Sequence, residues 1–122
     1  MAEARRTALV TGANRGLGRE IAGRLAQTGL RVVVTARVAA AAVRAADEIR
    51  AGGGDALPVA LDVTDALAVA AAAAELVAGD VAVDVLVNNA GILIDGEHGL
   101  PDLPPAILRT TLETNVIGPL LL

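Results

Sequence analysis

A glycine-rich segment near the start of the chain is the first place where residue types and spacing indicate chemistry. Residues 11–18 read Thr-Gly-Ala-Asn-Arg-Gly-Leu-Gly, after an apolar run and before an amphipathic stretch. Glycine permits a sharp turn and lets backbone N–H groups approach an anion, while a following helix adds unpaired donors and partial positive charge. The pattern predicts a pyrophosphate-binding loop. Because the spacing is Gly-x-x-x-Gly-x-Gly rather than the commoner Gly-x-Gly-x-x-Gly, an ordinary turn is the alternative. The candidate binding residues here are Thr11, Gly12, Asn14, Arg15, Gly16, Leu17 and Gly18.

Small or polar residues also follow two later apolar segments. The pair Asp62-Val63 comes after one of them, and the segment Asn88–Gly91 closes the other. In a doubly wound sheet, ligands bind beyond the carboxyl ends of the strands, which places both motifs beside the glycine loop. For Asp62 a turn or a helix cap is the alternative, and for 88–91 a turn that only stabilises the sheet. The candidate binding residues in these motifs are Asp62, Val63, Asn89, Ala90 and Gly91.

Strands and helices are predicted to alternate along the chain. The apolar pattern predicts strands at 7–11, 31–36, 56–61 and 83–88, helices at 17–28, 39–51 and 65–78, a loop at 92–101 and a last helix that begins at Pro104 or Pro105. Nearly continuous apolar strands between helices indicate a parallel sheet that is covered on both faces. The expected fold class is therefore α/β with a doubly wound parallel sheet.

Composition narrows the class of protein. A chain of 122 residues without an evident linker is expected to form a single domain over 1–122. The net charge of −4 and the absence of Phe, Tyr and Trp argue against nucleic acid as a partner. The chain has no cysteine, no signal-peptide pattern and no apolar run long enough to span a membrane, so we expect a cytoplasmic protein. His98 stands alone in a polar loop, which makes it a poor metal site, and no metal is expected.

The motifs together resemble those of the classical short-chain dehydrogenase/reductases. The loop at 11–18, Asp62-Val63, Asn88–Gly91 and Asn115 stand in that family's order and at about its spacing, over essentially the whole chain. The resemblance implies a Rossmann-like fold, a contact of Asp62 with the adenine amino group and a turn after the fourth strand that is braced by Thr11. Right-handed crossovers and the family's topology predict the strand order 3-2-1-4. The glycine loop is most similar to that of carbonyl-reductase-like members.

The second strand is expected to select the cofactor. Enzymes of this type that prefer NAD place a carboxylate on the ribose 2′-hydroxyl about 20 residues beyond the glycines. Ala36 stands at that place, Arg37 follows it, and Arg15 lies in the glycine loop. Two guanidinium groups would form charge-assisted bonds with a 2′-phosphate, so NADP(H) is expected in preference to NAD(H). The alternative is that both arginines are solvated surface charges.

The catalytic residues of the family are mostly missing from this sequence. Its hydride transfer uses a tyrosine as general acid or base, a lysine that lowers the pKa of that tyrosine, a serine that holds the substrate carbonyl and an asparagine that anchors a relay water. The chain has no Tyr, Ser or Lys, and only Asn115 matches. Pro119 lacks the N–H that would bond the carbonyl of Asn115 in a helix, which frees that carbonyl for water or merely bends the helix.

Two function classes remain open. In the first, the chain is the N-terminal fragment of an NADP(H)-dependent oxidoreductase that acts on a small carbonyl or alcohol substrate, inactive by itself and homo-oligomeric at full length. In the second, it is a non-catalytic NADP(H)-binding module or a redox sensor. A downstream Ser followed by Tyr-x-x-x-Lys would favour the first.

Overall fold

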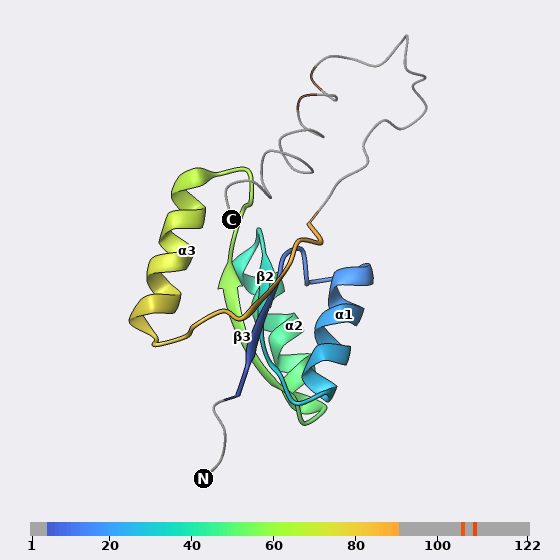
Figure 1. The fold of residues 1–122 in the computed structure, drawn as a ribbon. Coiled ribbons are helices and arrows are strands. Elements are labelled where there is room, and N and C mark those ends of the chain that lie inside the picture. Colours follow the sequence, from blue (N-terminus) through green and yellow to red (C-terminus); the bar gives the residue numbers. More distant parts are fainter. Residues whose placement is uncertain (1–4, 91–105, 107–108, 110–122) are drawn as a thin grey trace.

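The computed structural model describes residues 5–90 together with Ala106 and Arg109. Strands and helices alternate through this part of the chain, as Figure 1 shows. The elements are β1 (Thr7–Val10), α1 (Gly16–Gln27), β2 (Arg31–Ala36), α2 (Ala39–Ala51), β3 (Asp55–Ala60), α3 (Ala66–Ala78) and β4 (Val85–Val87). Gly91, the expected loop at 92–101, the expected last helix and Asn115 lie outside the described residues.

The strands form one parallel sheet in the order β3-β2-β1-β4. Val10 of β1 lies in register with Val34 of β2 on one side and with Val87 of β4 on the other. The predicted α/β class and the predicted strand order are therefore confirmed. The carboxyl ends of all four strands point to the same edge, and the loops that carry the candidate motifs leave from there.

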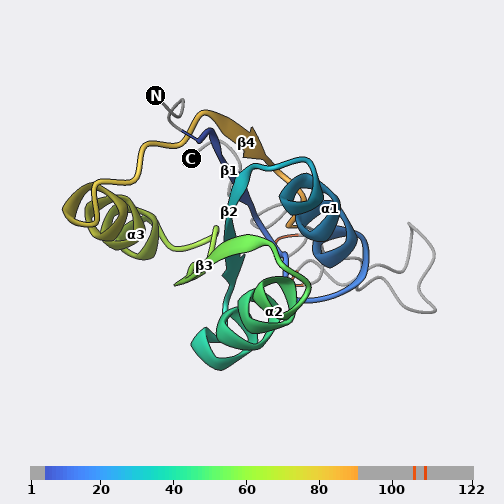
Figure 2. The ribbon, with the colours of Figure 1, turned by 90° about the horizontal axis from the view of Figure 1, so that it is seen from below.

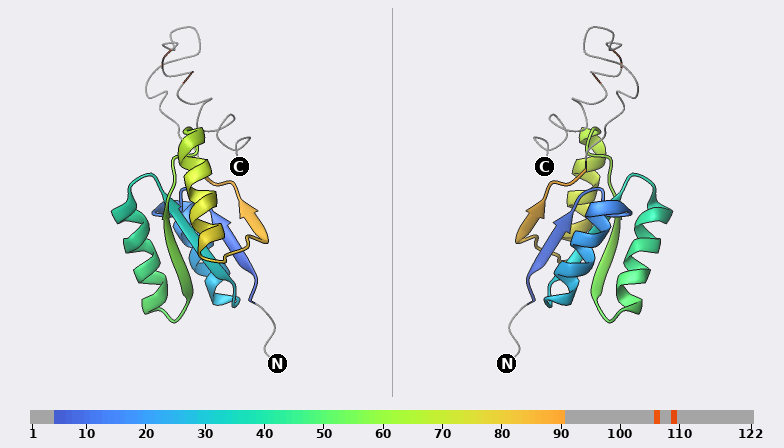
Figure 3. Two further views of the ribbon diagram at one scale, coloured as in Figure 1. Left: turned by 90° about the vertical axis from the view of Figure 1, so that its left-hand side faces the viewer. Right: turned by 90° about the vertical axis from the view of Figure 1, so that its right-hand side faces the viewer.

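Helices cover both faces of the sheet. Helices α1 and α2 lie on one face and α3 lies on the other, as the views in Figure 2 and Figure 3 show. The strand β2 serves both layers, because Val32 and Val34 pack toward α1 and α2 whereas Val33 packs toward α3. The helices offer mainly alanine to this core, with Ala22, Ala26, Ala45, Ala46 and Ile49 on one side and Ala72 on the other. Small side chains let the layers approach closely, so the core closes without an aromatic residue.

The predicted boundaries are correct for β2 and α2, while β4 is shorter than expected. We expected a strand over 83–88, but the ladder includes only Val85–Val87. At its start, the carboxylate of Asp84 accepts a hydrogen bond from the backbone N–H of Thr7 at 2.8 Å, in place of a backbone carbonyl. At its end, the N–H of Asn89 turns back to the carbonyl of Val87 at 3.1 Å. A side chain and a turn thus take over the bonds that a longer strand would make.

None of the helices in the described part of the chain is long and apolar enough to cross a membrane.

The C-terminus of α2 shows where glycine is required by backbone conformation. Gly52 and Gly53 follow this helix, and the N–H of Gly54 bonds back to the carbonyl of Ile49 at 3.0 Å. Gly53 has a φ of +91°, in the left-handed region that residues with a Cβ rarely adopt, whereas Gly52 has a φ of −84°. No atom lies within 4 Å of a Cβ built on Gly53, and the nearest to one on Gly52 is 3.5 Å away. The two positions therefore differ in backbone strain and not in available space.

Gly53→Ala should lower the free energy of unfolding by about 1 kcal/mol, because the Cβ of alanine makes the left-handed backbone conformation at this position unfavourable. Gly52→Ala is the matched control, and it should be neutral or raise stability by about 0.5 kcal/mol through the lower entropy of its unfolded chain. Urea unfolding followed by circular dichroism measures both. Equal destabilisation by the two variants would contradict the argument.

Candidate functional site

A pocket of about 300 Å³ lies at the carboxyl edge of the sheet. Each of the four strand ends contributes to it, so segments far apart in the sequence meet here. Its lining residues are Gly12, Asn14, Arg15, Gly16, Leu17, Gly18, Arg37, Leu61, Asp62, Val63, Asn89 and Ala90. Every predicted cofactor-binding residue is on this surface except Thr11, which is buried, and Gly91, which lies outside the described residues. That these residues bind a cofactor stays a prediction.

The glycines of the loop have different structural roles. Gly12 has a φ of +60°, and a Cβ there would lie 3.0 Å from the Cα of Ala90. A Cβ on Gly18 would overlap the side-chain amide of Asn89 and the carbonyl of Gly12. Gly12 and Gly18 therefore let the turn after β4 pack against the loop. Gly16 has a φ of +58° and nothing within 4 Å of a Cβ position, so it faces open space at the pocket.

The N-terminus of α1 is open toward the same pocket. The helix begins at Gly16, and its N-cap Arg15 makes no side-chain capping bond. Its first turn also contains no acidic residue. The unpaired backbone N–H groups and the positive end of the helix dipole are therefore free to interact with an anion.

Thr11 joins the glycine loop to the turn after β4. Its Oγ1 accepts hydrogen bonds from the backbone N–H groups of Asn89 and Ala90, both at 2.9 Å, and donates to the carbonyl of Val87 at 3.4 Å. The Nδ2 of Asn89 returns two bonds of 3.2 Å to the carbonyls of Thr11 and Gly12. Thr11 thus fixes the turn after β4 against the glycine loop, although Thr11 itself does not line the pocket.

Asp62 forms a turn and also lines the pocket. Its Oδ1 accepts from the hydroxyl of Thr64 at 2.6 Å and from the backbone N–H of Thr64 at 3.0 Å. The hydroxyl bond, followed by the backbone bond, lowers the pKa of Asp62, and the charge of Arg37 acts in the same direction. The side-chain turn that we considered as the alternative role of Asp62 is therefore present. Helix capping is not the role of Asp62, because Asp65 caps α3 by accepting from Leu67 and Ala68 at 3.0 and 3.3 Å.

Two arginines give the pocket positive charge. Arg15 and Arg37 are exposed, and neither takes part in the ion pairs found among the described residues, which involve Arg5, Arg19, Arg24, Arg31 and Arg50. Ala36, where an NAD-selective carboxylate was considered, is buried. Directly beyond it, the N-cap Val38 of α2 makes no side-chain bond, and the first turn of α2 is free of acidic residues. A second open helix N-terminus thus lies beside Arg37.

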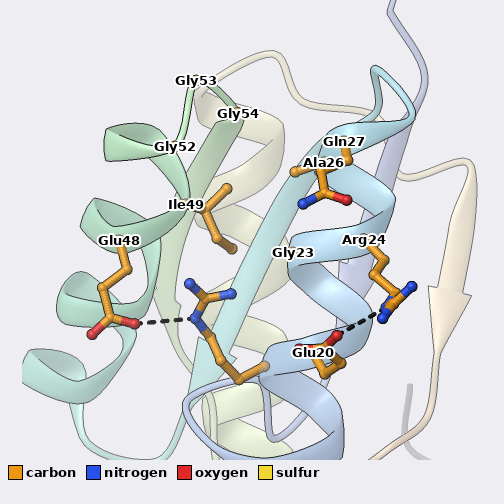
Figure 4. A pocket seen from close by; sticks show the side chains of 11 residues that line it. Glu20, Gly23, Arg24, Ala26, Gln27, Glu48, Ile49, Gly52, Gly53 and Gly54 are labelled. Atoms are coloured by element: carbon orange, nitrogen blue, oxygen red, sulfur yellow. Dashed lines mark hydrogen bonds and ion pairs between the residues drawn. The ribbon is translucent and has the colours of Figure 1, made fainter.

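A larger hollow of about 510 Å³ lies between α1 and α2 (Figure 4), and it shares no lining residue with the first pocket. Its charged side chains are already paired with one another. The Nε of Arg19 lies 3.2 Å from a carboxylate oxygen of Glu48, and that of Arg24 lies 2.8 Å from one of Glu20. Because its charges are satisfied internally, this hollow is a weaker candidate for a charged ligand than the smaller pocket.

Sequence reasoning missed two residues that shape the site. Leu61 lines the pocket through its place between β3 and Asp62. Thr64 fixes the Asp62 carboxylate, and the Asp-x-Thr spacing that favours such a side-chain turn was a signal that could have identified it. Among the described residues, no group of three His, Cys, Asp or Glu side chains could hold a metal ion.

Comparison with known proteins identifies the class to which this fold and pocket belong. The family model described as short chain dehydrogenase matches residues 6–122, and the chain belongs to that family. It is 39% identical over 117 residues to L-rhamnose 1-dehydrogenase (NAD(P)(+)) from Azotobacter vinelandii, covering 93% of this chain and 45% of that enzyme. The chain therefore spans about half the length of this relative.

Solved structures agree with this assignment. A metagenomic short-chain oxidoreductase in complex with NADP is 40% identical with a TM-score of 0.85, covering 95% of this chain and 52% of that one. An actinorhodin polyketide ketoreductase with NADPH is 38% identical with a TM-score of 0.87, covering 95% of this chain and 44% of that one. Identities at this level support the family as well as the fold.

Thr11→Val should destabilise the protein by about 2 kcal/mol, because the part-buried N–H of Ala90 loses its acceptor and the N–H of Asn89 keeps only its 3.1 Å bond to the carbonyl of Val87. Thr11→Ser keeps the hydroxyl and should retain most of the stability. Thermal and urea unfolding followed by circular dichroism compare the two. A valine variant as stable as the serine variant would show that the hydroxyl does not hold this turn.

Asp62→Asn should cost stability at neutral pH and progressively less as the solution is acidified. The pKa of Asp62 is lower in the folded protein than its ordinary value. The stabilisation is therefore present above the unfolded pKa, about 3.9, and is lost as the pH falls through the lower folded pKa. Urea unfolding at neutral pH and at several values below about 4 tests the trend. The exposed Glu75→Gln, outside this turn, is the control. A stability difference for Asp62→Asn that stayed constant with pH would contradict the linkage.

Proposed function

We propose that the chain is the nucleotide-binding part of an NADP(H)-dependent oxidoreductase that transfers hydride between a nicotinamide and a carbonyl or alcohol substrate. The observation that carries the proposal is one pocket in which an open helix N-terminus, an ionised aspartate and two arginines without an ion pair to residues 5–90 meet. When bound, the nicotinamide would supply or accept the hydride. The name of the rhamnose dehydrogenase relative, which includes NAD(P)(+), supports this class of cofactor.

The residues of the pocket suit the separate parts of such a dinucleotide. The N–H groups at the start of α1, with Asn14 and the open side of Gly16, would hold the pyrophosphate. The remaining loop residues Leu17 and Gly18 would complete this wall, with Thr11 and Gly12 holding the loop in place. Asp62, beside Val63, would accept from the amino group of adenine. Asn89, Ala90 and Gly91 would follow the cofactor past the end of β4.

NADP(H) is proposed as the preferred cofactor because the charges beside Ala36 favour a phosphate. Arg15 and Arg37 would pair with the 2′-phosphate, and the uncapped N-terminus of α2 would add donors and partial positive charge. No carboxylate stands at Ala36 to accept from a free 2′-hydroxyl. Relatives solved with NADP and NADPH support the choice.

The chemical step is proposed to need residues that these 122 do not contain. Proton transfer to a carbonyl oxygen requires a positioned acid, which typically contributes ~10²–10⁴-fold to the rate. The sequence contains no Tyr, Ser or Lys for this task. Asn115 would anchor a relay water in the longer enzyme, which we propose to be a homo-oligomer.

Because the sequence contains no Tyr, Ser or Lys, a second function is also considered. In that case the chain is a non-catalytic NADP(H)-binding module or a redox sensor. Reading the gene beyond the codon of Leu122 separates the two. An in-frame Ser followed by Tyr-x-x-x-Lys would support the enzyme, and an immediate stop codon would support the binding module.

Arg37→Gln should weaken binding of NADP(H) about tenfold and leave NAD(H) binding unchanged, because one charge-assisted bond to the 2′-phosphate is lost. Arg44→Gln is the matched control, since Arg44 is also an exposed arginine but does not line the pocket. Ala36→Asp should weaken NADP(H) further and improve NAD(H) binding. Isothermal titration calorimetry with both cofactors measures these changes. Equal affinities of the unaltered chain for the two cofactors would overturn the proposed preference.

A further inference from the structure

Thr64 acts on the pocket through a single side chain. It lies between β3 and α3 and does not line the pocket. Its hydroxyl donates to Oδ1 of Asp62 at 2.6 Å, and its backbone N–H donates to the same oxygen at 3.0 Å. A hydroxyl-to-carboxylate bond of this length is in the range of charge-assisted hydrogen bonds.

The two bonds make the two oxygens of Asp62 unequal. Oδ1 is engaged twice, while no hydrogen bond reaches Oδ2 within residues 5–90. Two donors from one residue also restrict rotation of the carboxylate. Asp62, which lines the pocket, therefore keeps Oδ2 as an acceptor without a partner in this part of the chain, on a carboxylate whose rotation is restricted.

The same bonds keep Asp62 an acceptor. The bond from the Thr64 hydroxyl is the largest cause that lowers the pKa of Asp62, which favours the ionised form. An ionised carboxylate accepts hydrogen bonds and cannot donate them. It can therefore pair with an exocyclic amino group, and it repels a carbonyl oxygen at the same place.

We propose that Thr64 is a positioning residue that makes Asp62 select a 6-amino purine over a 6-oxo purine. The inference rests on the proposed function, because it assumes that the purine of a dinucleotide lies against Asp62. It goes further by assigning base selectivity to a residue outside the pocket.

The test compares NADPH with its hypoxanthine analogue, in which a carbonyl oxygen replaces the amino group. Isothermal titration calorimetry on the chain should show about tenfold tighter binding of NADPH, the value of one charge-assisted bond. Thr64→Val, which keeps the shape and removes the hydroxyl, should reduce this ratio about fivefold, mostly through weaker NADPH binding. Thr64→Ser should restore the ratio. Asp62→Asn should abolish it, because an amide can rotate to accept or to donate.

The outcomes separate this inference from the proposed function. If neither nucleotide binds the unaltered chain, the proposed function is overturned and the inference with it. If both bind and Thr64→Val weakens them by the same factor, Thr64 has only a structural role and the inference alone is overturned. Circular dichroism checks that each variant is folded. Thr64→Ala, which also lacks the hydroxyl, replaces the valine variant if that one does not fold, and it must show the same loss of ratio.

Discussion

The hydroxyl of Thr11 connects the two sides of the pocket, and the geometry of the site depends on it. Strand β1 lies between β2 and β4, so its end is the point where the glycine loop and the turn after β4 must meet. Two backbone N–H groups of that turn bond to one buried oxygen at 2.9 Å. The side-chain amide of Asn89 donates in turn to the carbonyls of Thr11 and Gly12, so each segment donates hydrogen bonds to or accepts them from the other at several points. A ligand surface built from loops thereby gains the rigidity of the sheet.

This close contact explains why the three glycines of the loop, which belong to one sequence motif, would respond differently to substitution. Gly12 and Gly18 are small because the turn after β4 approaches them, and a side chain at either would push Ala90 or Asn89 away. Gly16 is constrained only by its backbone, since space is open around it. All three glycines of the loop line the pocket, but a Cβ at Gly12 or Gly18 would also collide with a neighbouring segment, whereas one at Gly16 would not.

The sequence predicted most of the fold because local and tertiary preferences agree in it. The apolar run of β2 and the alanine-rich α2 were placed with their correct bounds, and the alternation of elements gave the parallel sheet. The bounds of β1, α1, β3 and α3 differ from the prediction by one residue, and the largest error is at β4, where a side chain replaces a backbone acceptor. Asp84 shortens β4 by pairing with Thr7, which lies 77 residues away in sequence. The grouping of site residues followed from topology, whereas the bond of Thr64 to Asp62 depends on a rotamer that periodicity does not report.

The distribution of charge around the pocket explains why that bond matters. The chain carries a net charge of −4, yet within residues 5–90 Asp62 is the only carboxylate that lines the pocket, beside Arg15 and Arg37. The charge of Arg37 acts on Asp62, yet the two side chains form no ion pair among the described residues. The two bonds from Thr64 hold the carboxylate in its turn instead. The pocket is thus lined by both positive and negative charge, and the carboxylate has its two hydrogen-bond donors in Thr64 rather than in an arginine.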